Sequence, residues 1–452
     1  MQSKKLMAVA SSLFASALVL AGCTSTASSD GAADTSGASE STATEATNVS
    51  MVLWPGPEGE AMQKVVDSYN AGQGVADGVE VEQILLSRED TFSKEAALMK
   101  AESSEYDIYF TASYLIGQHA GYLTPATGVD ASVYLAASVE SLQVDGMQYG
   151  VPLDTSLHFM YYREDLVETL SDAANADLYS SIANEVLGKS LTPNADPSTW
   201  TWEDAIATAA FFTQEYNPNS PTKYGYALPA KNLLYNTMIW NNLLWGLGGN
   251  WVDSSGAPAI SSDAGIEAIE LYATIYDKGL TSPDSAQWEY GETNAALTTG
   301  NAMMALQWNA AFSELSTTGE TAGKLGIAPP PGSGPRTHVH SLAVALNKFS
   351  ANQEAAQKWL AFLATEEAMA IYAENGGVPS MPGILTGMVD TNASFENMIE
   401  YANEIGYSEP KVAREFDIYA ALAEELSVAW LGQESASAAA EAADAAMAEL
   451  LE

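Results

Sequence analysis

Cysteine and basic residues are scarce in this chain of 452 residues. Cys23 is the only cysteine, so no disulfide can form within the chain and stability has to come from ordinary hydrophobic cores. Only 17 lysines and arginines stand against 58 aspartates and glutamates, which gives a net charge of −41. A surface this acidic repels nucleic acid and anionic lipid headgroups. Neutral or cationic ligands fit better, although one buried arginine can anchor an anion, and the charge also suits the solubility of an exported protein.

Long hydrophobic runs are missing except for one near the start. The run from Leu6 to Leu20 follows Lys4 and Lys5 and leads into Ala21-Gly22-Cys23. It is too short to span a bilayer as a mature helix, and with its charged start and small residues before the cysteine it is typical of a secretory signal. Cysteine directly after Ala-Gly is the bacterial lipobox. We therefore predict that residues 1–22 are removed and that lipid on Cys23 holds the protein at the outer face of the cell membrane. A Gram-positive surface is favoured, with a periplasmic lipoprotein as the alternative.

Recognisable catalytic motifs are also absent. The sequence has no Gly-x-Ser-x-Gly, no His-Glu-x-x-His and no complete phosphate loop. Gly188-Lys189-Ser190 comes closest to such a loop, but Ala183 occupies the place of its leading glycine. A glycoside hydrolase needs two carboxylates across a sugar, and nothing marks such a pair here. His338 and His340 have a spacing that could hold a metal, but no third ligand is identified. We predict no enzymatic activity, no metal and no cofactor.

What the sequence does contain is a flexible start followed by alternating strands and helices. Residues 23–47 are dominated by small and polar types and have no aromatic residue, so they are predicted to form a disordered tether. The alternation that follows indicates a βαβ sheet covered by helices. Strands are predicted at 49–54, 79–85, 106–110, 301–308 and 339–346. Helices are predicted at 60–70, 91–101, 201–214, 233–247, 262–278, 290–299, 352–363, 365–374 and 438–450.

Two local signals mark the ends of helices. Thr201 is predicted to cap the helix that follows it, with Asp204 at the capping-box position. Gly376-Gly377 is predicted to stop the helix over 365–374. Pro329-Pro330-Pro331-Gly332 breaks regular structure and is interpreted as a crossing between lobes.

Several motifs, in order, resemble those of the family 1 extracellular solute-binding proteins, the sugar-binding lipoproteins of ABC importers. The resemblance covers nearly all of the mature chain. It departs from the family pattern at Arg163, where Asn or Lys is usual, and at 338–341, where a Gly-Gly pair often stands. The motifs that carry it are Trp54–Glu60, Tyr106-Asp107-Ile108, Tyr149-Gly150-Val151-Pro152 with Met160-Tyr161-Tyr162-Arg163, Thr199–Asp204, Gly300–Met304 and Gly376-Gly377-Val378-Pro379.

This resemblance implies a fold and a function. The expected fold class is α/β, a two-lobed periplasmic-binding-protein-like type II fold with a hinge and a central ligand cleft. Residues 48–153 with 333–378 would form lobe one, and residues 154–332 with 379–452 would form lobe two. The expected function is capture of a neutral carbohydrate, an oligosaccharide, by a monomer that delivers it to the permease subunits of an ABC importer.

A sugar pocket needs aromatic rings for the apolar faces of the sugar and fixed donors and acceptors for its hydroxyls. Trp308 and Trp54 are predicted to stack on pyranose rings from opposite lobes. For several candidates a structural role is the alternative: a packed helix face for Trp240, a hinge hydrogen bond for Asp154, and a helix N-terminal charge for Glu58. The predicted substrate-binding residues are Trp54, Glu58, Ser113, Asp154, Trp240, Asn241, Trp308, Asn309, Ser380 and Asp417.

Other ligands and roles stay open at the level of the sequence. A polyamine would require several converging carboxylates, and a sugar phosphate would require converging basic residues, which are scarce here. A peptide or a metal chelate is a further possibility for the same fold. A purely structural surface lipoprotein would have no cleft and no stabilising ligand.

Overall fold

A computed structural model describes residues 46–412 and 414–451. The predicted signal peptide, the lipid site at Cys23 and nearly all of the predicted tether lie outside these residues. Within the described part, no helix is both long and apolar enough to cross a membrane.

A nine-stranded mixed sheet organises the described chain. Its strands run in the order β2-β1-β3-β10-β6-β8-β7, with β11 added to β10 and β9 added to β6. A separate hairpin is formed by β4 and β5. The strands are β1 (Thr47–Leu53), β2 (Val79–Leu85), β3 (Ile108–Ala112), β4 (Gln143–Val144), β5 (Met147–Gln148), β6 (Val151–Arg163), β7 (Tyr224–Tyr226), β8 (Ala302–Trp308), β9 (Leu325–Ala328), β10 (Thr337–Leu346) and β11 (Gly406–Tyr407).

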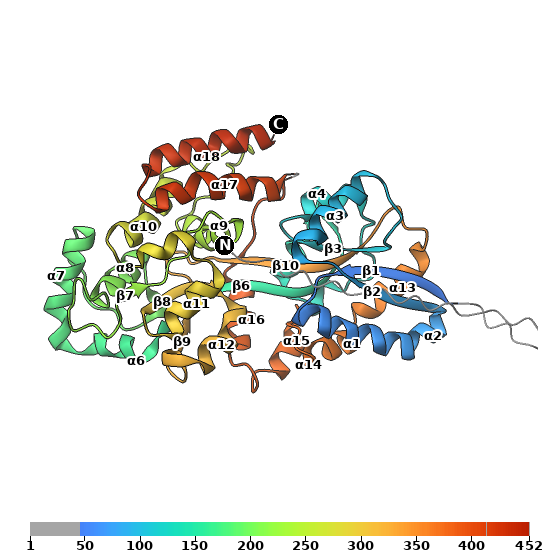
Figure 1. Cartoon of the computed structure of the whole chain (residues 1–452), viewed down its shortest axis with the longest axis horizontal. Helices are drawn as coiled ribbons and strands as arrows, with labels where there is room; N and C mark the ends of the chain where they lie inside the picture. Colours follow the sequence, from blue (N-terminus) through green and yellow to red (C-terminus); the bar gives the residue numbers. More distant parts are fainter. Residues whose placement is uncertain (1–45, 413, 452) are drawn as a thin grey trace, which may run out of the picture. The chain divides into compact units, whose positions relative to one another are not determined.

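The sheet has two sections that share β6 and β10. In the first section, β1 lies parallel to β2 and β3, and β3 pairs antiparallel with β10. In the second section, β7 lies parallel to β8, and both β8 and β9 pair antiparallel with β6. Strand β6 pairs with β10 through residues 151–157 and with β8 and β9 through residues 158–163. Figure 1 shows β6 and β10 crossing between the two groups of elements.

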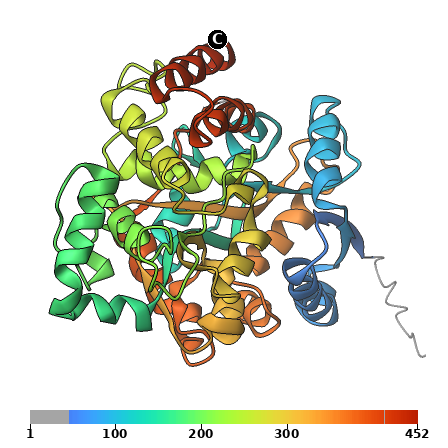
Figure 2. The same cartoon turned by 60° about the vertical axis from the view of Figure 1, so that its left-hand side comes forward.

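Helices cover both sections. Figures 1 and 2 show α1 and α13 beside the strands of the first section, and α17 and α18 as a pair next to α9 and α10 in the second. The helices are α1 (Pro57–Ala71), α2 (Gln73–Asp77), α3 (Arg88–Lys100), α4 (Ile116–His119), α5 (Ala136–Glu140), α6 (Glu164–Val167), α7 (Ala176–Leu187), α8 (Trp202–Phe211), α9 (Leu234–Gly246), α10 (Asp263–Asp277), α11 (Tyr290–Thr298), α12 (Phe312–Thr317), α13 (Gln353–Leu363), α14 (Glu366–Glu374), α15 (Pro382–Gly387), α16 (Ser394–Glu404), α17 (Glu415–Trp430) and α18 (Ala436–Leu451).

Each strand and helix predicted from the sequence has a counterpart, usually within a few residues of the predicted ends. The capping box before α8 is confirmed. The hydroxyl of Thr201 accepts a hydrogen bond from the Asp204 amide at 3.1 Å, and the Asp204 carboxylate accepts from the Thr201 amide at 2.9 Å. Helices α7 and α16 and the strands β6, β7 and β9 are among the elements that were not predicted.

The position of the crossing differs from the sequence-based interpretation. Gly332 donates its amide to the main-chain oxygen of Trp200 at 2.8 Å, so the segment of residues 329–332 lies against the second section. The strand β10, which follows it, makes the crossing. The predicted lobe boundary between residues 153 and 154 falls inside β6, close to where its pairing partners change, and the lobe boundaries stay a prediction.

Candidate functional site

A cavity of about 320 Å³ lies between the two sections of the sheet, within the roughly 300–1,000 Å³ of small-molecule sites. Aromatic side chains and polar groups both line its wall. The first section, β6 and β10 contribute Trp54, Glu58, Tyr114, Ser156, His340 and Leu342, and the second section contributes Leu233, Tyr235, Asn236, Ile239, Glu289, Tyr290, Gln307, Trp308 and Ala310.

Strand ends place three of the aromatic residues in this cavity. Trp54 follows the last residue of β1, Tyr114 follows β3 by one residue, and Trp308 is the last residue of β8. Strands β1 and β3 are parallel, so their carboxyl ends open on the same edge, which is where ligands of open α/β sheets bind. Strand β8 runs antiparallel to β6 and so opposite to β1 and β3, and its carboxyl end reaches the cleft from the other section. The cleft is therefore a direct consequence of the topology.

Trp308 is the aromatic residue best placed to stack on a ligand. Its side chain is half-buried and lines the cavity. The ring of His158 lies 4.0 Å from the Trp308 ring and that of His340 lies 4.8 Å away, both measured between centroids. These contacts hold the indole in place while part of it faces the cavity.

Trp54 is held more tightly than Trp308. Only 2% of its surface is exposed, and its ring meets Phe110 and Phe92 edge to face at 4.4 and 5.6 Å. It can therefore offer only a small part of its ring to a ligand.

Acidic and amide side chains supply the polar part of the cavity. Glu58 stands in the first turn of α1, and Glu289 precedes α11 and pairs with Lys231 at 3.3 Å. Asn236 donates to the main-chain oxygens of Lys231 and Trp288 at 2.9 and 3.0 Å. Neither lysine nor arginine is among the residues that line the cavity.

Two of the predicted site residues instead join segments beneath the cleft. Asp154 accepts hydrogen bonds from the Tyr372 hydroxyl at 2.5 Å and from the Val378 amide at 2.8 Å. Burial, with a smaller contribution from Glu58, raises the pKa of Asp154 to about 7 against the lowering effect of these two bonds. Ser380 accepts from the Thr155 hydroxyl at 2.7 Å and donates to the oxygen of Leu153 at 3.1 Å. These contacts match the hinge hydrogen bond weighed as the alternative for Asp154.

Trp240 and Asn241 lie in the core of the second section. Trp240 is fully buried with its ring 6.3 Å from that of Trp430. Asn241 donates to the Tyr419 hydroxyl and accepts from the Trp251 indole, both at 3.0 Å. The residues of α9 that line the cavity are Tyr235, Asn236 and Ile239 instead. Trp240 and Asn241 lie further along α9 and are fully buried in the core, so neither lines the cavity.

The remaining three candidates have other partners. Asn309 is buried and accepts a hydrogen bond from the Leu157 amide at 3.1 Å. Asp417 lies at the surface, where it pairs with Arg414 at 3.0 Å. Ser113 is fully buried, and its main-chain oxygen accepts a hydrogen bond from Lys411 at 3.2 Å. None of the three lines the cavity.

Lys411 also belongs to a buried charged cluster. Its ammonium lies 3.4 Å from Glu409 and 3.7 Å from Glu415, and the side chains of both glutamates are fully buried. Burial opposes the charge of Lys411, but the two carboxylates outweigh it and raise its pKa. Burial raises the pKa of Glu415 well above its usual value. The cluster ties the segment before α17 to the end of β3.

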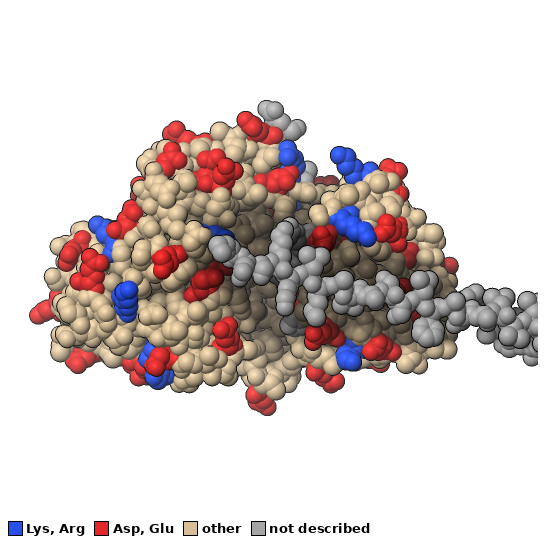
Figure 3. All heavy atoms as spheres, in the orientation of Figure 1, with Lys and Arg blue, Asp and Glu red and all other residues tan. Residues whose placement is uncertain are grey.

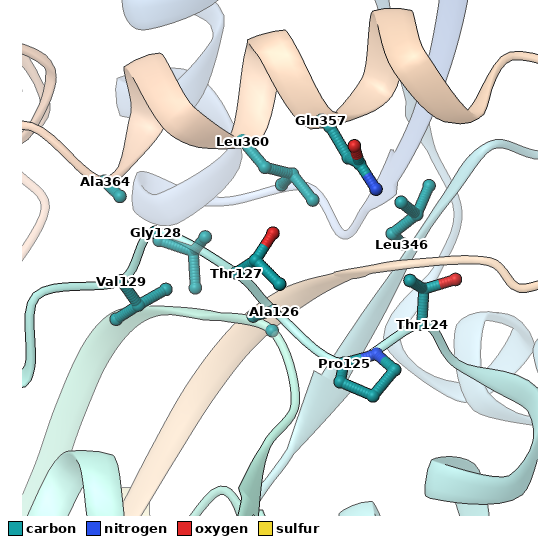
Figure 4. Close-up of a pocket in the computed structure, with 12 residues that line it drawn as sticks. Thr124, Pro125, Ala126, Thr127, Gly128, Val129, Leu346, Gln357, Leu360 and Ala364 are labelled. Atoms are coloured by element: carbon teal, nitrogen blue, oxygen red, sulfur yellow. The ribbon is translucent and has the colours of Figure 1, made fainter.

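The described residues line further hollows besides the cleft. A second cavity, between α13 and the loop of residues 124–129, has a volume of only about 20 Å³, enough for one water (Figure 4). Acidic side chains are spread over the face seen in Figure 3, with few basic ones among them. In the described part of the chain, no group of three or more His, Cys, Asp or Glu residues is placed to hold a metal.

Several cavity residues were not singled out in the sequence. Tyr235, Asn236, Glu289, Tyr290 and Gln307 come from the starts of α9 and α11 and from the end of β8. The first turn of a helix that begins at the cleft edge is the only local signal for the residues of α9 and α11. Gln307 had a signal of a different kind, its position directly before Trp308.

Comparison with known proteins defines the class. The family described as bacterial extracellular solute-binding protein matches residues 64–397, and the chain belongs to this family. Maltose-bound MalE3 from T. maritima is similar over 89% of this chain and 100% of its own, with 20% identity and a TM-score of 0.71. A cyclic α-maltosyl-1,6-maltose binding protein from Arthrobacter globiformis covers 90% of this chain and 99% of its own, with 19% identity and a TM-score of 0.69. The predicted fold class, α/β and two-lobed, is thereby confirmed.

A curated relative that matches a shorter part of the chain is named for a different cargo. A probable amino-acid ABC transporter periplasmic-binding protein, y4oP of Sinorhizobium fredii, is 25% identical over 194 residues, which are 42% of this chain and 42% of that protein. The matched region spans about half or less of the length of such curated relatives. The family and the fold are those of binding proteins rather than enzymes.

Proposed function

We propose that this protein captures a neutral oligosaccharide in the cleft and delivers it to the permease of an ABC importer, without catalysing a reaction. The observation that carries the proposal is the cavity wall, where Trp308, Tyr235 and Tyr290 stand beside amide and carboxylate groups. Aromatic faces bind the apolar faces of a pyranose, and the polar groups bind its hydroxyls. Of the sequence candidates, Trp54, Glu58 and Trp308 line this wall and are proposed as ligand contacts.

The charged side chains of the cavity wall favour a neutral carbohydrate as the ligand. An amino acid, a peptide or a sugar phosphate presents an anionic group that usually pairs with arginine or lysine, and the wall contains neither. Glu58 and Glu289 favour one second candidate, a polyamine or other cationic solute. The structures with similar folds whose names include maltose or a maltosyl sugar support the neutral carbohydrate.

The proposal extends to the place and partners of the protein. The lipobox supports cleavage before Cys23 and a lipid anchor at the outer face of the cell membrane. The acidic, alanine-rich body and the Ser/Thr-rich segment after Cys23 favour a Gram-positive cell. The residues before β1 would act as the tether. The protein would work as a monomer that presents its ligand to the permease subunits, and it would not bind nucleic acid.

A thermal-shift screen of the purified protein tests the proposal. The panel contains malto-, isomalto-, cello- and xylo-oligosaccharides, with spermidine, dipeptides and glucose phosphate as controls. A ligand that binds only the folded protein raises the melting temperature as its concentration exceeds the dissociation constant. A shift with one group of oligosaccharides is expected. Shifts with spermidine or dipeptides alone would contradict the carbohydrate proposal and leave the solute-binding fold unaffected.

A further inference from the structure

Gln307 connects two aromatic residues of the cleft. Its side chain is fully buried, and its Oε1 accepts a hydrogen bond from the main-chain amide of Trp308 at 3.0 Å. Its Nε2 donates to the main-chain oxygen of Tyr290 at 3.1 Å. One amide group therefore holds the end of β8 and the start of α11, and each of these ends carries an aromatic side chain into the cavity.

The orientation of this amide is determined by its neighbours. The Nε2 of Gln307 also donates to Oδ1 of Asn294 at 3.0 Å, and Asn294 donates from its own nitrogen to a Glu314 carboxylate oxygen at 2.7 Å. A carboxylate and a carbonyl only accept, and a main-chain amide only donates. A flipped Gln307 amide would place oxygen against the Tyr290 and Asn294 oxygens and nitrogen against the Trp308 amide. The network from Glu314 to Trp308 thus has a single consistent arrangement.

We infer that Gln307 is a positioning residue that sets the separation of Trp308 and Tyr290 and so determines which sugar rings the cleft accepts. This inference rests on the proposed function of the cleft as a carbohydrate site. Trp308 and Tyr290 stand on different elements, so a change in the Gln307 bridge moves one ring relative to the other. A sugar ring that fits the separation between the Trp308 and Tyr290 rings would bind more tightly than a sugar of another shape.

Three variants test the role of Gln307. Q307E keeps the size of the side chain and an acceptor for Trp308, but it cannot donate to Tyr290 and Asn294 together: the ionised carboxylate donates to neither, and the protonated carboxyl donates to only one. E314A removes an exposed side chain at the far end of the hydrogen-bond network. We expect this variant to fold, so it tests the network even if Q307E fails to fold. N347D is the matched control, because Asn347 is an equally buried amide that bridges the Ser103 and Tyr106 oxygens and the Phe349 amide in the first section.

Two measurements are made on each variant. The first is the acrylamide quenching of Trp308 fluorescence without ligand, obtained as the difference from the same variant carrying W308F. The second is the set of dissociation constants for maltotriose, isomaltotriose and cellotriose. We expect Q307E to change the quenching, to weaken binding about tenfold and to change the order of preference among the three sugars. E314A should change the Trp308 quenching and the dissociation constants in the same direction as Q307E does, but by a smaller factor. N347D should lower the melting temperature and leave the Trp308 quenching and the dissociation constants unchanged.

The outcomes separate this inference from the proposed function. If Q307E and E314A leave Trp308 quenching as it is in the unmodified protein, or if N347D changes it as much as Q307E does, the positioning role is refuted. If the unmodified protein binds none of these sugars, nor the oligosaccharides of the wider screen, the carbohydrate proposal fails. The quenching measurement then still decides whether Gln307 positions Trp308.

Discussion

The hydroxyl of Tyr372 donates a hydrogen bond of 2.5 Å to a carboxylate oxygen of Asp154, and this bond joins α14 to β6 where the crossing begins. The other Asp154 oxygen accepts from the Val378 amide at 2.8 Å. A carboxyl group buried at this junction has consequences for both stability and pH dependence.

Asp154→Asn should change how stability depends on pH. Burial raises the pKa of Asp154 to about 7, so between about pH 4 and pH 7 the unfolded chain has lost this proton and the folded chain keeps it. The group therefore lowers the free energy of unfolding as pH rises, by up to about 1.4 kcal/mol per pH unit. Urea denaturation at pH 4.5 and pH 7.5 should show the variant gaining stability relative to the unmodified protein at the higher pH. An equal difference at both values would contradict the raised pKa.

Trp308→Ala should weaken ligand binding without unfolding the protein. Loss of a stacking aromatic removes roughly 1–3 kcal/mol of binding free energy, which is about a 5- to 150-fold rise in the dissociation constant. Isothermal titration with the best oligosaccharide of the screen measures it. W308F should retain part of the affinity because it keeps an aromatic face. The stacking role is wrong if both variants bind as tightly as the unmodified protein.

Trp240→Ala should have the opposite effect: it should lower the stability of the protein and leave ligand binding nearly unchanged. Trp240 is fully buried in the core of the second section, and removing so large a buried side chain destabilises by about 3–5 kcal/mol. Chemical denaturation measures this loss. Binding by the folded fraction should stay within about twofold of the unmodified protein, because Trp240 does not line the cavity. A large loss of affinity with little loss of stability would return Trp240 to the binding site.

Lys411→Met should destabilise the protein at neutral pH. The substitution leaves Glu409 and Glu415 buried without their cation, and breaking a buried ion pair in this way costs about 3–5 kcal/mol. The loss should shrink as pH falls, because the uncompensated carboxylates then take up protons. Lys324→Met is the control. Its pair with Glu320 is well exposed at 3.8 Å and contributes at most about 1 kcal/mol. Similar losses for the two variants would argue against a special role for the buried cluster.

Local sequence signals predicted the regular elements well. Alternating apolar residues in β2, the cap at Thr201 and the glycine stop after α14 are all short-range features. Strand β6 had no such signal. Nearly all of its residues are buried, so apolar and polar residues do not alternate along it, and Pro152 stands near its start. Its length comes from pairing with three other strands, which is tertiary information.

The binding site was harder to predict for the same reason. Trp54 follows β1, Trp308 ends β8, and Glu58 stands in the first turn of the helix after β1. The ends of such elements can be recognised in a sequence. Gln307 and Tyr290 are in contact only because β8 and α11 pack together, although 16 residues separate them in the chain. On α9 the sequence indicated the right helix, but it indicated Trp240 and Asn241 instead of Tyr235, Asn236 and Ile239. Which residues of a helix meet a cavity depends on how the helix packs.

The shared strands β6 and β10 also determine how the cleft can change shape. Hydrogen bonds join them along the crossing, so movement of one lobe against the other has to twist a two-stranded ribbon rather than rotate about one flexible residue. Small changes in dihedral angle over many peptide units add up in such a ribbon, and each is opposed by the ladder. Closure of the cleft would therefore be spread over both strands of the crossing instead of being confined to one residue.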